Sequence, residues 1–206
     1  MSGPRPPAGA AVDSSAPPLA TAGHGRLPAG ALADRLAAGG VVAVVDVRSY
    51  PGSRRHPDLA RQPLAAALAD AGIAYRWEPR LGGFRRGRPD SPNVALRHPS
   101  FRAYADHMTT SEFLDALDEV LAERLERAGP PPSGLLALLC AETLWWRCHR
   151  RLIADAALLL RGVDVVHLMP NGTFAHHALT PGARRDGSGF LVYDGRDASP
   201  GPQRRP

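Results

Sequence analysis

The alternation of short apolar runs with amphipathic segments is the feature that most constrains the fold. The clearest run, VVAVVDV at 41–47, is continuous and β-branched, which is typical of a strand buried on both faces of a parallel sheet. Other apolar runs predict strands at 18–23, 73–77, 135–140 and 163–168. Helical patterns alternate with the strands, at 28–38, 61–71, 100–107, 110–127 and 145–161. The order predicts a Rossmann-like, three-layer α/β domain with a mostly parallel sheet and helices on both faces.

The two ends of the chain differ in composition from the rest. Residues 1–17 and 195–206 are rich in Pro and Gly and poor in apolar residues, so we expect disordered tails around a single α/β domain at 18–194. Within that domain, Thr109 and Thr110 followed by Glu112 predict a capped start for the helix at 110–127.

Cellular location follows from what the sequence lacks. No apolar run is long enough to span a bilayer, and the N-terminus has no apolar signal-peptide core. We therefore expect a cytoplasmic protein that does not bind membranes. In a reducing cytosol its two cysteines are expected to be thiols, ligands or nucleophiles rather than a structural disulfide.

Charge points to an anionic partner. The chain has a net charge of +5 and no lysine, so that every basic residue apart from histidine is arginine. Coding bias explains the number of arginines, but their position beside other polar residues is informative, because the planar guanidinium suits phosphate or carboxylate.

Polar residues collect where three predicted strands end. In an open parallel sheet the carboxyl ends of the strands face one crevice, and polar side chains follow the first, second and fourth strands. They are His24; then Asp46, Arg48, Arg54 and Arg55; then Cys140, Glu142, Cys148, His149 and Arg150.

Each group has a functional and a structural interpretation. Asp46 and Arg48 point to the same side of a strand, so they either form a buried ion pair or handle a proton and hold an anion. Arg54 and Arg55 follow a Pro-Gly-Ser turn, where they either bind a ligand or form a solvated basic loop.

The cysteines allow three interpretations. Cys140 ends a strand, and Cys148 precedes His149 in the predicted first turns of a helix, where the helix dipole and nearby arginines favour thiolate. Buried hydrophobic cysteines are the second option. Zinc bound by Cys140, Cys148 and His149 is the third, but close-spaced ligand pairs are missing, and we predict no metal.

The sequence also lacks the familiar cofactor motifs. No P-loop, dinucleotide fingerprint or nucleophile elbow is present, so ATP, NAD and serine chemistry are not expected and no cofactor is predicted. Trp77, Trp145 and Trp146 either stack on bases or pack the domain.

A series of motifs resembles a known family. TAGHGR, DVRSYPGSRR, FRAYADHM, LLCAETLWWRCHRRLIAD and GVDVVHL occur in this order between about residues 18 and 180, and this series resembles the bacterial family catalogued as domain of unknown function 488. The resemblance implies one three-layer α/β domain and brings no established reaction. Gly25 and Trp145 depart from the hydroxyl residue and the proline that are commoner in similar proteins.

A fainter likeness is to rhodanese-type sulfurtransferases, which also have an Asp-x-Arg after a strand and a cysteine ending a later one. The segment after Cys140 lacks glycine and places Glu142 near the thiol. That carboxylate would repel an anionic intermediate and raise the pKa of Cys140, so a rhodanese activity is not expected and Cys148 is the better candidate for a reactive thiol.

Two functions remain as hypotheses. The first is an enzyme with an anion-binding crevice, in which His24, Arg48, Arg54, Arg55 and Arg150 bind a phosphate-bearing ligand such as a nucleotide or nucleic acid, a cysteine acts as nucleophile or redox thiol, and Asp46, Glu142 and His149 transfer protons. The second is a non-catalytic nucleic-acid- or protein-binding module with a structural polar cluster. The sequence predicts no oligomeric state.

Overall fold

The computed structural model describes residues 16–52, 56–127 and 134–196. The predicted tails lie largely outside these residues, as do Arg54 and Arg55.

The centre of the molecule is a six-stranded sheet with the order β3-β2-β4-β1-β5-β6. All neighbouring strands are parallel except β6, which runs antiparallel to β5. The strands are β1 (Leu19–Gly23), β2 (Val41–Asp46), β3 (Ala74–Trp77), β4 (Leu135–Cys140), β5 (Val165–Leu168) and β6 (Phe174–His176). Strand β4 lies between β1 and β2, and its alternate residues enter the apolar cores on the two faces of the sheet, as the continuous run LLALLC predicts.

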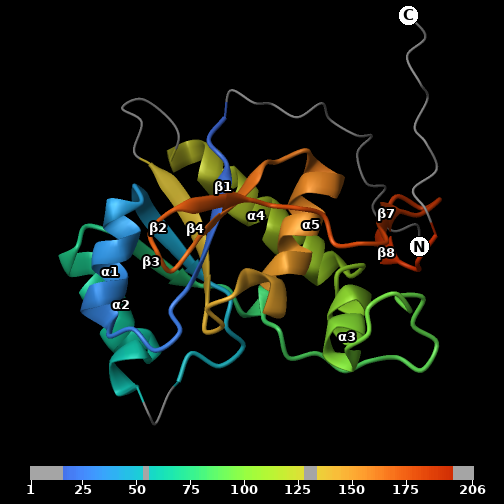
Figure 1. The fold of residues 1–206 in the computed structure, drawn as a ribbon, viewed down its shortest axis with the longest axis horizontal. Helices are drawn as coiled ribbons and strands as arrows, with labels where there is room; N and C mark the ends of the chain where they lie inside the picture. The colour runs from blue at the N-terminus through green and yellow to red at the C-terminus, as the bar shows by residue number, and fades with distance from the viewer. Residues whose placement is uncertain (1–15, 53–55, 128–133, 197–206) are drawn as a thin grey trace, which may run out of the picture.

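Helices cover both faces of this sheet, which confirms the predicted three-layer α/β fold (Figure 1). One apolar core contains Leu32, Leu36, Leu64 and Leu68 from α1 and α2, and a second contains Phe113, Leu117, Leu152 and Ile153 from α4 and α5. The helices are α1 (Ala29–Ala38), α2 (Arg61–Asp70), α3 (Pro99–His107), α4 (Ser111–Arg127) and α5 (Arg150–Arg161).

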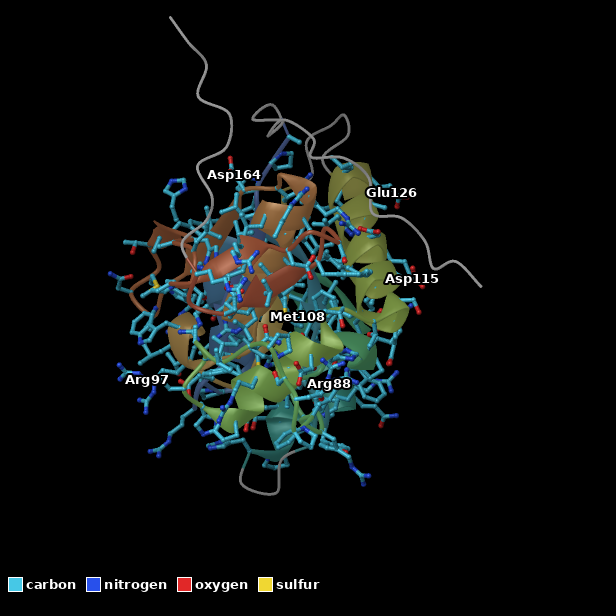
Figure 2. The ribbon with its side chains drawn as sticks, turned by 90° about the vertical axis from the view of Figure 1, so that its right-hand side faces the viewer. Arg88, Arg97, Met108, Asp115, Glu126 and Asp164 are labelled. Atoms are coloured by element: carbon cyan, nitrogen blue, oxygen red, sulfur yellow. The ribbon has the colours of Figure 1, made fainter. Side chains whose placement is uncertain are left out.

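Helix α4 shows how the sequence pattern determines packing. Its buried positions include Phe113, Leu117 and Val120, whereas Asp115 and Glu126 project from its outer side (Figure 2). The Thr110 hydroxyl accepts a hydrogen bond from the Phe113 N–H at 3.3 Å, so Thr110 is the N-cap of this helix.

The predicted helix at 145–161 is wrong in its first residues. Residues Trp145–Arg147 form a 3₁₀ turn (η3), Cys148 is extended with φ −123° and ψ 154°, and α5 begins only at Arg150. The Trp145 ring stacks on His167 of β5 with centroids 3.9 Å apart. This contact fixes the 3₁₀ turn against the sheet, and the chain must change direction at Cys148 before α5 can start.

Three short strands after β5 were not predicted. In addition to β6, the segments β7 (Ala183–Arg185) and β8 (Leu191–Tyr193) pair as a separate antiparallel hairpin. Their three-residue length gives too little periodicity for recognition. None of the helices in the described residues is long and apolar enough to cross a membrane.

Candidate functional site

The three polar segments meet at one edge of the sheet, as the strand order requires. Gly23 of β1 is in register with Cys140 of β4, and the N–H of His24 donates to the Cys140 carbonyl at 3.0 Å. On the other side of β4, the N–H of Val47 donates to the Leu139 carbonyl at 2.9 Å. The residues that follow β1, β2 and β4 are therefore immediate neighbours.

A cavity of about 380 Å³ opens at this edge. Five of the predicted site residues line it, namely Arg48, Cys140, Glu142, Cys148 and His149. Of the remaining predictions, His24, Asp46 and Arg150 are buried next to the cavity and do not line it. The wall is completed by Ser49, Tyr50, Gly83, Phe84, Arg85, Ser100, Phe101, Ala141 and Arg147.

The floor of this cavity holds a pair of free cysteines. Cys140 is 8% exposed and Cys148 is 5% exposed, and their sulfur atoms lie within 4.8 Å of each other and of a His149 ring nitrogen. A hydrogen bond from the Cys140 thiol lowers the pKa of Cys148 well below its ordinary value, with further lowering by His149 and Arg150. The same hydrogen bond and burial raise the pKa of Cys140. Of the two, Cys148 is thus the sulfur that ionises more readily, and Cys140 is the donor that hydrogen-bonds to it.

Glu142 does not have the electrostatic effect on Cys140 that the sequence suggested. The pKa of Cys140 is raised, as expected, but the causes are Cys148 and burial, and the backbone N–H of Glu142 lowers it. The Glu142 carboxylate instead accepts the N–H of Leu144 at 3.1 Å and is exposed at the cavity wall.

His149 is oriented by its second ring nitrogen. Nε2 lies 3.1 Å from the Val47 carbonyl, to which it can only donate, and Nδ1 lies 3.6 Å from the Cys148 sulfur. The ring also contacts Tyr104 at a centroid distance of 5.0 Å. Nδ1 therefore faces the sulfur, which is the arrangement of a cysteine–histidine pair.

Arg150 supplies a buried positive charge beneath the thiolate. It is 1% exposed, its Nε donates to the Cys148 sulfur at 3.4 Å, and its Nη2 donates to the Glu142 carbonyl. Within the described residues it forms no ion pair with a carboxylate. Because a buried charge requires a partner, the contact with the sulfur favours the thiolate form of Cys148 as the counter-ion of Arg150.

Asp46, Arg48 and His24 form a separate buried network. Arg48 Nη2 and Asp46 Oδ2 are 2.6 Å apart, and the Tyr75 hydroxyl donates to the same carboxylate at 2.7 Å. Arg48 also donates to His24 Nε2 at 3.2 Å, and burial together with Arg48 lowers the pKa of His24 to about 4. Asp46 and Arg48 thus form a buried ion pair, which was one of the two interpretations of these residues from the sequence.

Some backbone N–H groups in the loop from Ala141 to His149 are not available to an anion. The N–H of Arg147 donates to the Leu144 carbonyl and that of Cys148 to the Trp145 carbonyl, so these donors are already used. An anion in the cavity therefore needs other donors than these N–H groups.

Side chains at the rim of the cavity can bind an anion, and most of them were not singled out from the sequence. Arg147 is exposed and has no ion pair in the described part of the chain, whereas Arg85 donates mainly to backbone carbonyls. Tyr50 and Phe84, 78% and 80% exposed, lie with ring centroids 5.9 Å apart. The available signal was the long Gly/Pro/Arg-rich connection at 77–100, since such loops are often functional.

Cys140, Cys148 and His149 could also hold a metal. Two thiolates and one imidazole within 4.8 Å form a donor set that suits Zn²⁺ or another soft ion. The Nε2 contact with Val47 is the outer hydrogen bond that a metal-binding histidine usually makes. The cavity would leave a fourth coordination position open to solvent.

Histidines without readable partners in the sequence form a second buried network. A chain of hydrogen bonds joins Thr21 to His167 at 2.7 Å, His167 to His177 at 3.0 Å and His177 to Asp155 at 2.9 Å. Tyr193 donates to the other oxygen of Asp155 at 2.8 Å. Trp145 stacks over this network, so the tryptophan packs the domain.

The fold and site together define a class: an α/β protein with a cysteine–histidine centre at the carboxyl ends of its parallel strands. The chain belongs to the family described as Domain of unknown function DUF488, whose model matches residues 29–157. The match begins at α1 and ends within α5, a narrower range than the motifs at 18–180, and it contains both cysteines and His149. Comparisons with curated proteins and with solved structures gave no significant match.

Proposed function

We propose that this protein is a cytoplasmic enzyme that uses the Cys148 thiolate to act on a phosphate-bearing ligand, with nucleotides and nucleic acids as the first candidates. One observation carries the proposal: the Cys148 sulfur lies at the floor of a cavity, 3.4 Å from Arg150 Nε and 3.6 Å from His149 Nδ1. A thiolate stabilised in this way is a nucleophile at neutral pH.

The remaining cavity residues supply the other roles. Arg147 binds the anionic group, because it is the rim arginine without a competing carboxylate. Tyr50 and Phe84 offer aromatic faces to a planar part of the ligand. Glu142 faces the cavity from the wall and donates or accepts the proton of the leaving group. Asp46, Arg48 and His24 position the loop after β2 and do not contact the ligand.

The test is alkylation by iodoacetamide as a function of pH, with mass spectrometry to locate the label. We expect Cys148 to react well below the pH at which an ordinary thiol ionises, about 8.5. Cys140→Ala removes the donor to the thiolate and should shift the profile of Cys148 to higher pH, whereas Cys140→Ser retains a donor and should restore it.

Cys148→Ser, folded as judged by circular dichroism, is the control and should leave only slow labelling at Cys140. If folded wild-type protein is labelled at neither cysteine below that pH, the nucleophile assignment fails. The non-catalytic binding module would then be the better explanation of the buried cluster.

A metal centre is the second candidate function, and the convergence of Cys140, Cys148 and His149 within 4.8 Å favours it. Metal content should be measured in purified protein and in Cys148→Ser. If the wild type holds a stoichiometric zinc ion that the variant lacks, the cysteines and His149 form a Cys₂His metal site and Cys148 is not a nucleophile. Metal-free protein with a reactive Cys148 supports the thiolate enzyme.

A further inference from the structure

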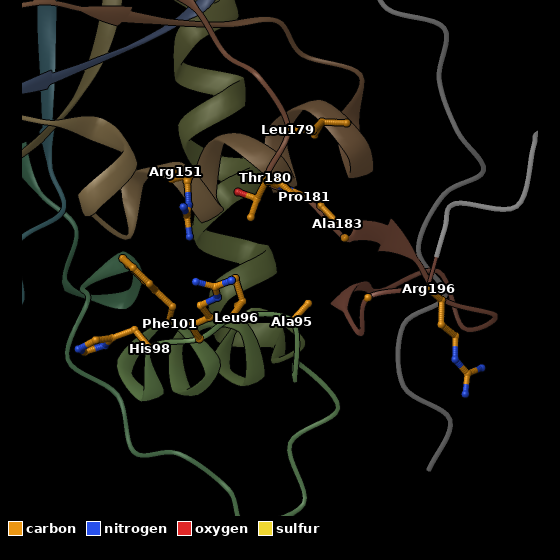
Figure 3. Close-up of a pocket in the computed structure, with 13 residues that line it drawn as sticks. Ala95, Leu96, His98, Phe101, Arg151, Leu179, Thr180, Pro181, Ala183 and Arg196 are labelled. Carbon is orange, nitrogen blue, oxygen red and sulfur yellow. The ribbon is translucent and has the colours of Figure 1, made fainter.

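A second and larger cavity lies next to the thiol site. Its volume is about 870 Å³, and it lies between the segment from Ala95 to Phe101 and the segment from Leu179 to Ala183. Phe101 lines both cavities, so the two adjoin. Figure 3 shows Arg151 and Thr180 projecting from one wall, with Leu96 and Phe101 on the opposite wall.

The lining of this cavity is basic. It contains Arg97, Arg151, Arg196 and His98, with neither aspartate nor glutamate among its residues. Arg97 is exposed and makes no ion pair within the described residues. Arg196, by contrast, forms an ion pair in which its Nε lies 3.6 Å from Asp194 Oδ2. The Arg151 guanidinium lies 4.9 Å from the centre of the Phe101 ring, which orients it without neutralising it.

Two buried polar atoms of the lining lack hydrogen-bond partners among the described residues. They are Arg151 Nε and Thr180 Oγ1, and Thr180 is only 6% exposed. The Thr180 backbone is held in place because its N–H donates to Asp155 at 2.9 Å. Asp155 does not bond to either atom; its oxygens accept instead from the Thr180 N–H, His177 and Tyr193. Leaving such atoms unpaired destabilises the protein, and a bound acceptor would remove that penalty.

We propose that this cavity binds a phosphate group, with Arg151 and Thr180 as buried donors and Arg97 as the outer cation. Guanidinium forks and a hydroxyl that converge from separate segments match the several oxygens of phosphate better than a single carboxylate. The site stands independently of the thiol chemistry, although its contact with the first cavity through Phe101 would let one extended ligand occupy both.

Titration calorimetry with pyrophosphate, a nucleoside triphosphate and a single-stranded oligonucleotide tests the site, each at two salt concentrations. Thr180→Val is the sharpest variant, because it keeps the shape and the N–H to Asp155 and removes only the unpaired hydroxyl. We expect it to leave thermal stability unchanged or higher and to weaken binding roughly tenfold. Arg97→Gln should weaken binding and reduce its salt dependence.

Arg86→Gln is the matched control, since Arg86 is exposed and lines neither cavity. Cys148→Ser should also bind normally, which separates this site from the proposed reaction. Binding of pyrophosphate or the triphosphate indicates a small phosphate ligand, and binding of the oligonucleotide alone indicates nucleic acid. Absence of binding by all three probes, equal binding of a glutamate-rich peptide, or affinities unaffected by Thr180→Val and Arg97→Gln would overturn the proposal.

Discussion

At the scale of single residues, the state of Cys148 depends on neighbours that are distant in sequence. Its sulfur is contacted by Arg150 and His149, and His149 is oriented by the carbonyl of Val47 from another strand. Arg150, polar and charged, is nevertheless among the largest fully buried side chains of the described residues. The Cys148 sulfur gives this buried charge a partner when it is ionised, so that the two charges would then stabilise each other.

Gly83 tests how far His149 contributes to this arrangement. A Cβ at this position would lie 2.6 Å from His149 Nδ1, so Gly83→Ala must displace the ring. We expect the alkylation rate of Cys148 at neutral pH to fall several-fold, because the thiolate loses a stabilising contact.

Gly87→Ala provides the control, since its nearest new contact is the Ala103 Cβ at 3.5 Å, an ordinary packing distance. Unchanged alkylation in a folded Gly83→Ala protein would show that the imidazole is dispensable for the reactivity of Cys148.

At the scale of elements, the link between β4 and α5 places the candidate nucleophile. The chain leaves the central strand at Cys140, passes through the 3₁₀ turn of η3 and reaches Cys148 immediately before α5. The break before the helix brings the second sulfur back over the end of β4. An uninterrupted helix from Trp145 would carry residue 148 into its second turn.

The other end of α5 allows a quantitative prediction. Gly162 adopts a left-handed conformation with φ 64° and ψ 29°, and its N–H donates to the Leu158 carbonyl at 3.1 Å. Gly162→Ala should lower the free energy of unfolding by about 1–2 kcal/mol, because an L-residue is strained there.

Urea denaturation measures this change. Gly30→Ala serves for comparison, since a Cβ there meets no atom within 4 Å, and it should preserve or raise stability. A Gly162→Ala protein as stable as the wild type would contradict the role of Gly162 as the helix cap.

At the scale of the whole molecule, buried histidines make folding sensitive to acid. Burial and Arg48 lower the pKa of His24 to about 4, and burial with His177 lowers the pKa of His167 to about 3. In the folded protein both side chains therefore stay neutral at pH values below 6.5, the ordinary pKa of histidine. The unfolded chain therefore binds more protons, and stability is lost as the pH falls from 6.5 toward these lower values.

Urea denaturation should show this loss of stability between pH 7 and pH 4. The pKa shifts of His24 and His167 set this range. Each histidine contributes about 1.4 kcal/mol per pH unit below its unfolded pKa. His24→Gln should lower stability at neutral pH, because the network with Arg48 changes. It should also reduce the dependence of the unfolding free energy on pH by the contribution of one histidine. The same slope in His24→Gln would rule out His24 as a source of the acid sensitivity.

Much of the architecture is determined by local sequence. Apolar runs and 3.6-residue periodicity predicted β1 to β5 and the five helices, apart from the start of α5, because burial on one or two faces leaves a pattern in the chain. The convergence of His24, the Asp46 segment and Cys140 followed from strand order alone. The three-residue strands β6, β7 and β8 were missed because pairing, and not periodicity, defines them.

Only the tertiary structure decided which polar residues are paired with one another. The sequence grouped Arg48, Arg150 and Asp46 with the ligand-binding or catalytic side chains, but Arg48 is paired with Asp46 and Arg150 with Cys148. It also left Arg97, Arg151 and Thr180 without assignment, although they meet in one cavity. A sequence specifies which charges are present. The pKa and the availability of each depend on burial and on partners far along the chain, and these exist only once the sheet has brought the segments together.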